Sequence, residues 1–161
     1  MFVRWLVLAV ASSVLLLAGC GSDDDDHTTT SVAITPELAG DWTGQLTQKG
    51  IAPFQIAVRI ASDGTGRVAY TGIECGGRWT AKNELASSPP AAYNFREEIT
   101  QGVGGECKGK GVVSIGPNPP RAPKTLSYGF SGGGVSSAGS LHKTDAAGLE
   151  PVFDEAGVTP P

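Results

Sequence analysis

Short runs of alternating apolar and polar residues dominate the chain from residue 38 onward. In the first run, 38–46, Trp42 and Leu46 share one face with two glycines, while Asp41 and other polar residues occupy the opposite face. This period of two is typical of a β-strand with one buried face. We therefore predict a strand here and regard it as the first of a series.

The same alternation returns in further runs, each of them short. They cover residues 54–61, 67–73, 77–82, 93–99, 107–115, 126–130 and 136–143. Turn signals such as Asp63-Gly64 separate them, and a Pro-rich stretch at 116–123, which we expect to form a loop outside the sheet, precedes the seventh strand. Eight strands in simple succession predict an all-β fold, a small antiparallel up-and-down barrel over residues 38–144.

A helix-rich fold is excluded because no segment after residue 35 shows a sustained apolar period of 3.6 residues. The final segment, 145–161, contains Pro151, Pro160 and Pro161 and shows no clear periodicity. We expect this tail to be disordered or loosely packed.

Composition and charge refine this prediction only slightly. Glycine accounts for 23 of the 161 residues, which suits a barrel with many tight turns. The net charge of −4 is uneven, because residues 38–144 hold 11 Lys and Arg against 7 Asp and Glu. The mildly basic body between acidic ends fits either a preference for anionic ligands or ordinary scatter with solubilising tails.

The first 19 residues have the architecture of a signal peptide, with Arg4 near the start and an apolar run too short to span a bilayer comfortably. Leu17-Ala18-Gly19-Cys20 resembles the lipobox of bacterial lipoproteins, in which the cysteine is acylated. The resemblance implies that Cys20 is the membrane anchor, on the extracytoplasmic face of the cell membrane. Cleavage by an ordinary signal peptidase, which leaves a free thiol, is the alternative.

Residues 20–37 then read as the lipidated cysteine and an acidic linker. The linker contains four consecutive aspartates, which end at Asp26 and are followed by His27. Repulsion between these charges keeps such a spacer extended. We expect no metal site there, because cation ligands must be held in a fixed geometry by a turn.

Gly40-x-Trp42 on a first strand resembles the opening motif of calycin-type barrels such as lipocalins and avidins. In those barrels the tryptophan plugs the closed end beneath a basic residue from the last strand. The resemblance implies this structural role for Gly40 and Trp42, with Lys143 or Arg121 as the basic residue.

Residues 38–143 also resemble a small domain of actinobacterial lipoproteins and of the extracellular parts of some bacterial serine/threonine receptor kinases. The matching residues are Gly40-x-Trp42-Thr43-Gly44, Cys75-Gly76-Gly77, Tyr93-x-Phe95-x-Glu97-x-Ile99-x-x-Gly102, Cys107 and Gly139-Ser140-Leu141. The Pro-rich stretch 116–123 departs from this pattern. No kinase domain is present, so kinase signalling is not implied.

Cys75 and Cys107 are the two cysteines that remain once Cys20 is acylated. Export places them in an oxidising compartment, where such a pair forms a disulfide. We predict this bond. The competing interpretation, a catalytic or metal-binding thiol pair, requires a nearby histidine, and only His142 is available.

Glu97 is the most informative single residue, because it shares the apolar face of its strand with Tyr93, Phe95 and Ile99. A carboxylate inside a barrel must be paired or must reach solvent. One interpretation makes Glu97 a ligand contact near the barrel mouth, with Tyr70 or Tyr128. The other makes it a structural residue, either an ion-pair partner or a hydrogen-bond anchor, with Arg78 or Arg59 as possible partners.

No pattern in the sequence indicates catalysis. A G-x-x-x-x-G-K match ending at Lys110 lacks the following Ser or Thr and the helix of a P-loop, and a G-x-S-x-G match around Ser131 lacks an α/β sheet. We expect no enzyme activity, metal, cofactor or nucleic-acid partner. The expected function is an envelope lipoprotein whose barrel binds or senses a small ligand. The alternative is a filled barrel that acts as a structural or protein-interaction module of the envelope.

Overall fold

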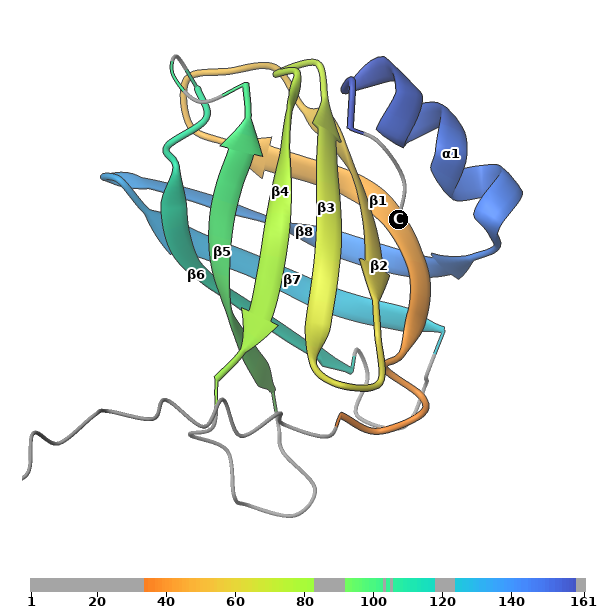
Figure 1. Cartoon of the computed structure of the whole chain (residues 1–161). Helices are drawn as coiled ribbons and strands as arrows, with labels where there is room; N and C mark the ends of the chain where they lie inside the picture. Colours follow the sequence, from red (N-terminus) through yellow and green to blue (C-terminus); the bar gives the residue numbers. More distant parts are fainter. Residues whose placement is uncertain (1–33, 83–91, 103, 105, 118–123, 159–161) are drawn as a thin grey trace, which may run out of the picture.

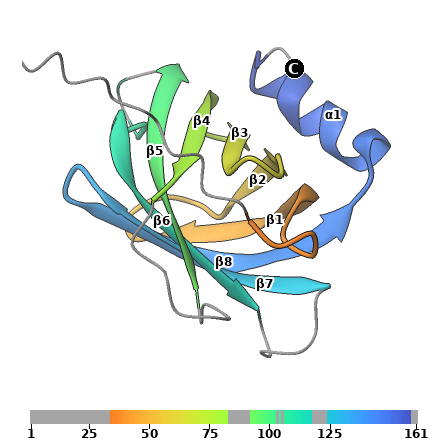
Figure 2. The same cartoon turned by 60° about the horizontal axis from the view of Figure 1, so that its bottom comes forward.

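The computed structural model describes residues 34–82, 92–102, 104, 106–117 and 124–158. Eight antiparallel strands follow one another around a closed barrel, which confirms the predicted fold class (Figures 1 and 2). The strands are β1 (Gly40–Gln48), β2 (Phe54–Ile60), β3 (Thr65–Thr71), β4 (Cys75–Ala81), β5 (Tyr93–Gln101), β6 (Lys110–Pro117), β7 (Thr125–Gly132) and β8 (Val135–Thr144).

The barrel closes where the first strand meets the last. β1 pairs with β2 on one side and with β8 on the other, in a register that runs from Asp41 opposite Thr144 to Gln48 opposite Ser137. Each remaining strand pairs with its neighbours in sequence, so no crossover connection is needed. Closure satisfies the backbone groups that a sheet edge exposes.

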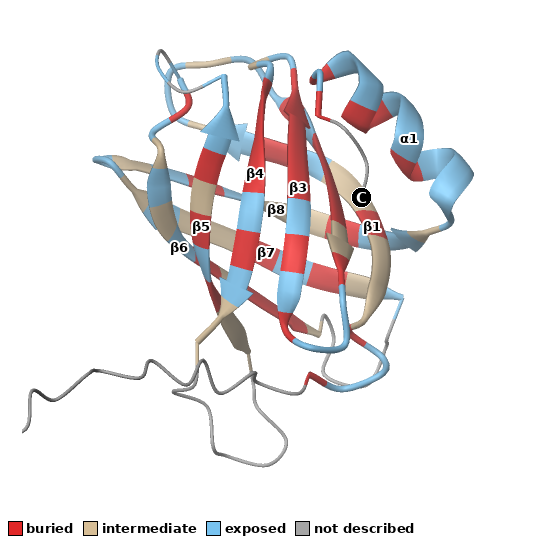
Figure 3. Cartoon of the chain, in the orientation of Figure 1, coloured by how far each residue is buried: buried red, intermediate tan, exposed pale blue. Residues whose placement is uncertain are grey.

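Alternating side chains from all eight strands fill the interior. The largest ones with no or almost no exposed surface include Trp42, Trp79, Phe95, Leu46, Ile56, Ile115 and Leu141. Figure 3 shows the resulting alternation of buried and exposed positions along the strands. Gly77 has a specific reason to be glycine, because a Cβ atom there would lie 2.2 Å from the backbone oxygen of Glu98, beside a register shift in the β4–β5 pairing.

One end of the barrel is covered by the segment that leads into β1. Ile34 and Leu38 of this segment are buried in the core. The Leu38 carbonyl accepts a hydrogen bond of 2.9 Å from the indole nitrogen of Trp42. The expectation that residues up to 37 form a spacer is therefore wrong for Ile34, whose apolar side chain gains more from burial than from solvation. Residues 20–33, with Cys20, lie outside the described part.

The C-terminal segment forms a helix, α1 (Ala146–Glu155), which corrects the expectation of a disordered tail for 145–158. Asp145 caps its N-terminus by accepting a hydrogen bond from the Gly148 backbone nitrogen. α1 lies on the outer surface of the barrel beside β1–β3 (Figures 1 and 3). Its apolar side packs on Ala57 and Ala69, in a second cluster with Leu149, Val152, Phe153, Ala156 and Val158.

Most strand ends differ from the sequence prediction by one or two residues, and the differences at β6 affect the interpretation. β6 begins at Lys110 rather than at residue 107, and Cys107 instead forms an isolated bridge with Gly104. β6 also extends to Pro117, opposite Leu126, so the Pro-rich stretch does not lie wholly outside the sheet. Pro117 is tolerated there because the pairing of β6 with β5 ends at Ile115, so the backbone N–H that a proline lacks is not needed on that side. Residues 118–123 lie outside the described ranges.

The predicted disulfide between Cys75 and Cys107 is present, with a Cα–Cα distance of 6.4 Å. It joins the first residue of β4 to the segment that precedes β6. Both cysteines are buried in the main core. The bond therefore fixes the β5–β6 connection over the end of the barrel that lies opposite Trp42.

Candidate functional site: a polar pocket at the open end of the barrel

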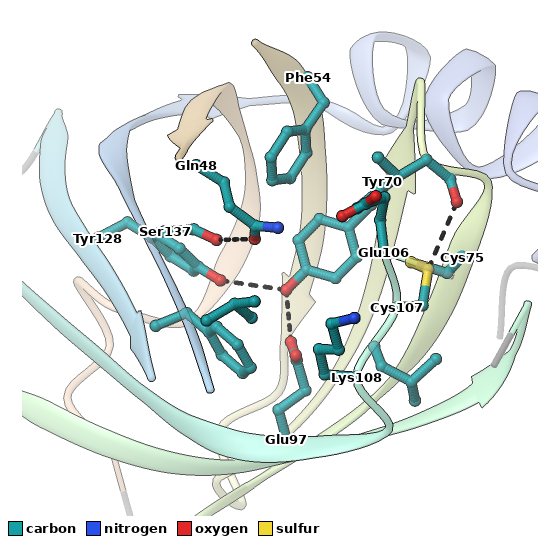
Figure 4. A pocket seen from close by; sticks show the side chains of 14 residues that line it. Gln48, Phe54, Tyr70, Cys75, Glu97, Glu106, Cys107, Lys108, Tyr128 and Ser137 are labelled. Carbon is teal, nitrogen blue, oxygen red and sulfur yellow. Dashed lines mark hydrogen bonds between the residues drawn. A yellow bond between two sulfur atoms is a disulfide. The ribbon is translucent and has the colours of Figure 1, made fainter. Parts of the chain in front are cut away.

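A small pocket opens at the end of the barrel that carries the disulfide (Figure 4). Its volume is about 30 Å³, which is room for about two water molecules. Exposed Glu106 and Lys108 lie on its rim, and buried Glu97, Tyr70 and Tyr128 form its floor. The other lining residues are Gln48, Phe54, Ile73, Cys75, Ile99, Cys107, Phe130, Val135 and Ser137.

Glu97, from the middle of β5, points inward and is only 3% exposed. Its Oε2 atom accepts a short hydrogen bond from the Tyr70 hydroxyl and one of 2.8 Å from the indole nitrogen of Trp79. Tyr70 comes from β3 and Trp79 from β4, opposite Glu97 in the β4–β5 register. Three neighbouring strands thus converge on one carboxyl oxygen.

The Tyr128 hydroxyl extends this network from the far wall. It lies 3.2 Å from the Tyr70 hydroxyl (Figure 4). When Tyr70 donates its only hydroxyl proton to Glu97, Tyr128 must donate to Tyr70. The Tyr128 ring stacks on Trp79 at a centroid distance of 6.2 Å, so packing holds both donors in place.

Burial controls the protonation of this cluster. It raises the pKa of Glu97 above the usual range of a glutamic acid, and the hydrogen bonds from Tyr70 and Trp79 lower it only in part. Burial and the neighbouring Glu97 carboxyl also raise the pKa values of Tyr70 and Tyr128 well above that of an ordinary tyrosine. The two tyrosines therefore remain neutral donors.

The basic partners suggested for Glu97 lie elsewhere. Arg78 bonds to Glu98 on the outside of the barrel, and its Nε atom lies 2.9 Å from the Glu98 carboxylate. Arg59 pairs with Asp41 at 2.7 Å. The two arginines are therefore wrong as partners, because alternation sends them to the outer face while Glu97 points inward. A hydrogen-bond anchor, the other form of the structural interpretation, fits the bonds that Glu97 accepts from Tyr70 and Trp79. Tyr70 and Tyr128 were named with Glu97 as ligand contacts. Tyr70 bonds to Glu97 directly, and Tyr128 joins the cluster through the Tyr70 hydroxyl.

Sequence reasoning missed several residues of the site. Trp79 donates to Glu97, and Ser137 donates a hydrogen bond of 2.7 Å to the Gln48 side chain beside the pocket. The alternation in 77–82 had placed Trp79 on an inward face, and this was the available signal. Its pairing with Glu97 depended on a strand register that periodicity does not determine.

The predicted plug of the closed end is formed by Trp42, which is fully buried. The Lys143 ammonium lies 5.3 Å from the centroid of its ring, so Lys143 takes the role proposed for the basic residue. Gly40 has φ +123°, and a Cβ atom at this position would lie 3.2 Å from Cε of Lys143. Arg121, the other candidate, lies outside the described residues.

Neither a metal cluster nor a spanning helix is found within the ranges that the structure describes. No group of three or more His, Cys, Asp or Glu side chains gathers there in a way that suits a metal ion. None of the helical segments in the same ranges has the length and apolar character needed to cross a bilayer.

The pocket therefore consists of a buried acid, two neutral hydroxyl donors and aromatic walls, at the end of the barrel opposite the plug. Comparisons with protein-family models, curated proteins and solved structures find no match for this chain. Its function must accordingly be argued from the geometry of the pocket.

Proposed function

We propose that the chain is a lipid-anchored protein of the cell envelope whose barrel binds a small ligand at its open end. The observation that carries the proposal is the convergence of Glu97, Tyr70 and Tyr128 at the floor of a pocket with an exposed rim. Ligand sites typically combine apolar walls with a few polar groups that fix orientation. A barrel of eight strands has room for a filled core or one small ligand.

The position of the proposed anchor is compatible with such a role. Residue 34, the first described residue, packs at the plugged end, and β1 runs from there to Gln48 at the pocket. The nine residues of β1 span about 27 Å along the strand, so the two ends of the barrel are well separated. A tether through acylated Cys20 would hold the plugged end and leave the pocket facing away from the membrane.

The volume of the pocket limits what binds. About 30 Å³ accommodates the head of a ligand rather than a whole lipid or cofactor. The remainder of a longer ligand would lie over the rim, against half-buried Phe130, Val135 and Ile73. The proposal is therefore end-on binding of a small molecule and not storage deep inside the barrel.

Native mass spectrometry of the exported chain from residue 21 onward tests ligand binding. The preparation must retain 145–158, because α1 packs on the barrel. We expect a mass excess that disappears on denaturation. Val135→Trp, on the pocket rim, should abolish the excess, whereas Ser136→Trp on the exposed outer face should leave it unchanged. A bare mass for the unaltered chain would contradict the proposal.

Membrane fractionation tests the anchor separately. Cys20→Ala should move the protein from the membrane fraction to the soluble extracytoplasmic fraction, because one residue carrying several acyl chains provides stable membrane attachment. Cys75→Ala is the control, because it removes a cysteine that is not the proposed anchor. The fraction of this variant that folds should remain bound to the membrane. Full retention of Cys20→Ala in membranes would overturn the anchoring proposal.

A second candidate function, an interaction module with a filled barrel, is favoured by the core itself. Trp42, Trp79 and Phe95 are among the large side chains that fill the interior with no or almost no exposed surface. Photo-crosslinking in cells separates the two functions. A protein adduct from a probe at Arg96, on the outer face, together with a bare native mass, would support the interaction module.

A further inference from the structure

We propose that the pocket binds the ammonium group of a small organic amine, with Glu97 as the counter-charge and the aromatic walls around it. This inference rests on the proposed function and specifies the chemistry of its ligand. Three observations carry it: the bonding of Glu97, the aromatic lining, and the balance of charge around the pocket.

Glu97 is a nearly buried acid and takes no part in the ion pairs that join Arg59 to Asp41, and Arg78 and Lys110 to Glu98. Burial raises its pKa, and the groups that lower this pKa in part are the neutral donors Tyr70 and Trp79. Both of its hydrogen bonds reach Oε2, and both donors are neutral. Burying a carboxylate without a cation costs free energy. A cationic ligand would offset this cost, so it should bind more tightly than a neutral ligand of the same size.

Aromatic rings surround the space in front of this carboxyl. Phe54, Tyr70 and Tyr128 line the pocket (Figure 4), and Phe130 also belongs to its lining. Phe54 and Tyr70 pack edge to face, with centroids 6.0 Å apart. The negative face of an aromatic ring attracts ammonium groups, and desolvation strengthens this attraction. Aromatic walls around a carboxyl group therefore favour a cation over an anion.

The charged residues that line the pocket also favour a cation over an anion. Glu97 and Glu106 supply two carboxyl groups, and Lys108 supplies one ammonium. The two buried tyrosines remain neutral, as their raised pKa values require. The net charge of the lining is negative when both acids are ionised, which opposes an anionic ligand and attracts a cationic one.

The volume of the pocket limits the size of the cationic group that it can hold. Room for about two waters is enough for an ammonium nitrogen and the carbon attached to it. The pocket lining offers three kinds of acceptor to a primary ammonium, which are the Glu97 carboxyl group, the Tyr128 hydroxyl and the Gln48 side-chain oxygen. An alkyl chain on the same carbon would leave through the rim beside Phe130 and Val135.

The test uses three probes of matched length, n-butylammonium, n-butanol and butyrate, titrated into the exported chain at constant pH and ionic strength. NMR shifts of the Trp79 indole proton, which bonds directly to Glu97, report on binding at the floor. We expect saturable shifts with butylammonium and at least about tenfold weaker binding of the other two, a difference of about 1.4 kcal/mol. Equal or tighter binding of butanol or butyrate would overturn the inference.

Two adjacent glutamates provide matched variants. Glu97→Gln keeps the shape of the side chain and removes its charge, and should weaken butylammonium binding about tenfold or more. Glu98→Gln makes the same change on the outside of the barrel, where Glu98 pairs with Arg78, and should leave binding unchanged. Retention of full affinity by folded Glu97→Gln would contradict the assignment. If Glu97→Gln does not fold, the comparison of the three probes on the unaltered chain still tests the ammonium assignment.

The outcomes also separate this inference from the proposed function. A native mass excess from an uncharged or anionic molecule, displaced by butanol or butyrate, would overturn the ammonium assignment and leave ligand binding supported. Absence of both a native adduct and any probe binding would overturn both.

Discussion

The ammonium of Lys143 lies 5.3 Å from the centroid of the Trp42 ring, and the two residues are direct partners in the β1–β8 pairing that closes the barrel. The same ammonium donates hydrogen bonds to the carbonyl oxygens of Glu37 and Ala39, at 3.3 and 3.1 Å. One side chain therefore joins the last strand, the plug and the segment that covers the closed end.

Lys143→Met should destabilise the fold by about 1 kcal/mol, because it removes an exposed cation–π contact and two charge-assisted hydrogen bonds while keeping the apolar stem. Urea denaturation followed by tryptophan fluorescence measures the change. Lys49→Met, in the exposed β1–β2 turn, is the control and should have little effect. An equal effect of both variants would show that Lys143 does not hold the closed end.

The strands were predictable because they depend on local patterns, and the plug because Gly40-x-Trp42 resembles the opening motif of calycin-type barrels. Alternation in runs such as 54–61 defines which face of a strand is buried, and eight such runs with short turns leave few topologies. The choice of Lys143 could not be made from the sequence alone, since it required the register between β1 and β8. The same limit applied to Trp79 and Glu97, whose pairing depends on a register shift between Gly76 and Gly77.

The helix α1 was missed for a different reason. It contains Gly148 and Pro151, both of which disfavour a helix, and it spans only ten residues. Such a helix is not stable alone, and its stability comes from packing on the outer face of the sheet. Small Ala57 and Ala69 make room for it there, but a sequence pattern does not show which outward alanines are covered.

Phe153→Ala should destabilise the protein by about 3–5 kcal/mol, the usual cost of truncating a buried aromatic residue. Phe153 is fully buried between α1 and the barrel. Glu155→Ala, on the exposed side of the same helix, is the matched control and should cost under about 0.5 kcal/mol. Thermal unfolding of both variants checks this, and a small loss for Phe153→Ala would mean that the helix does not dock in solution.

The double variant Cys75→Ser/Cys107→Ser lacks the disulfide, and its free energy of unfolding should be lower by about 3–4 kcal/mol. The bond closes a loop with a sequence separation of 32 residues, and the chain-entropy estimate for such a loop gives this range. Because Cys107 lies between Glu106 and Lys108, we also expect looser ligand binding at the pocket rim. Urea denaturation of the oxidised protein and of the double variant measures this loss of stability. Equal stability of the two proteins would contradict the prediction.

The adjacent acids Glu97 and Glu98 should affect stability with opposite dependence on pH. The pKa of buried Glu97 is raised, so the folded chain binds its proton more tightly than the unfolded chain does. The resulting stabilisation is complete below the pKa of an unfolded glutamic acid, about 4.3, and is lost as pH rises through the raised pKa. Arg78 and Lys110 lower the pKa of Glu98, which lies on the outer face. Its contribution to stability is therefore present above the unfolded pKa and is lost as pH falls through the lowered one.

Urea unfolding of the unaltered chain, Glu97→Gln and Glu98→Gln between pH 3 and pH 8 measures both effects. Relative to the unaltered chain, Glu97→Gln should gain stability as pH rises above about 4.3, and Glu98→Gln should gain it as pH falls below that value. Tyr70 and Tyr128, which face Glu97, remain neutral over this range because burial raises their pKa values. Glu106 and Lys108 on the pocket rim are common to all three proteins and cancel in the comparison. If Glu97→Gln followed the unaltered chain at every pH, Glu97 would have the same proton affinity in the folded and unfolded states, and its burial would carry no electrostatic cost for a ligand to relieve.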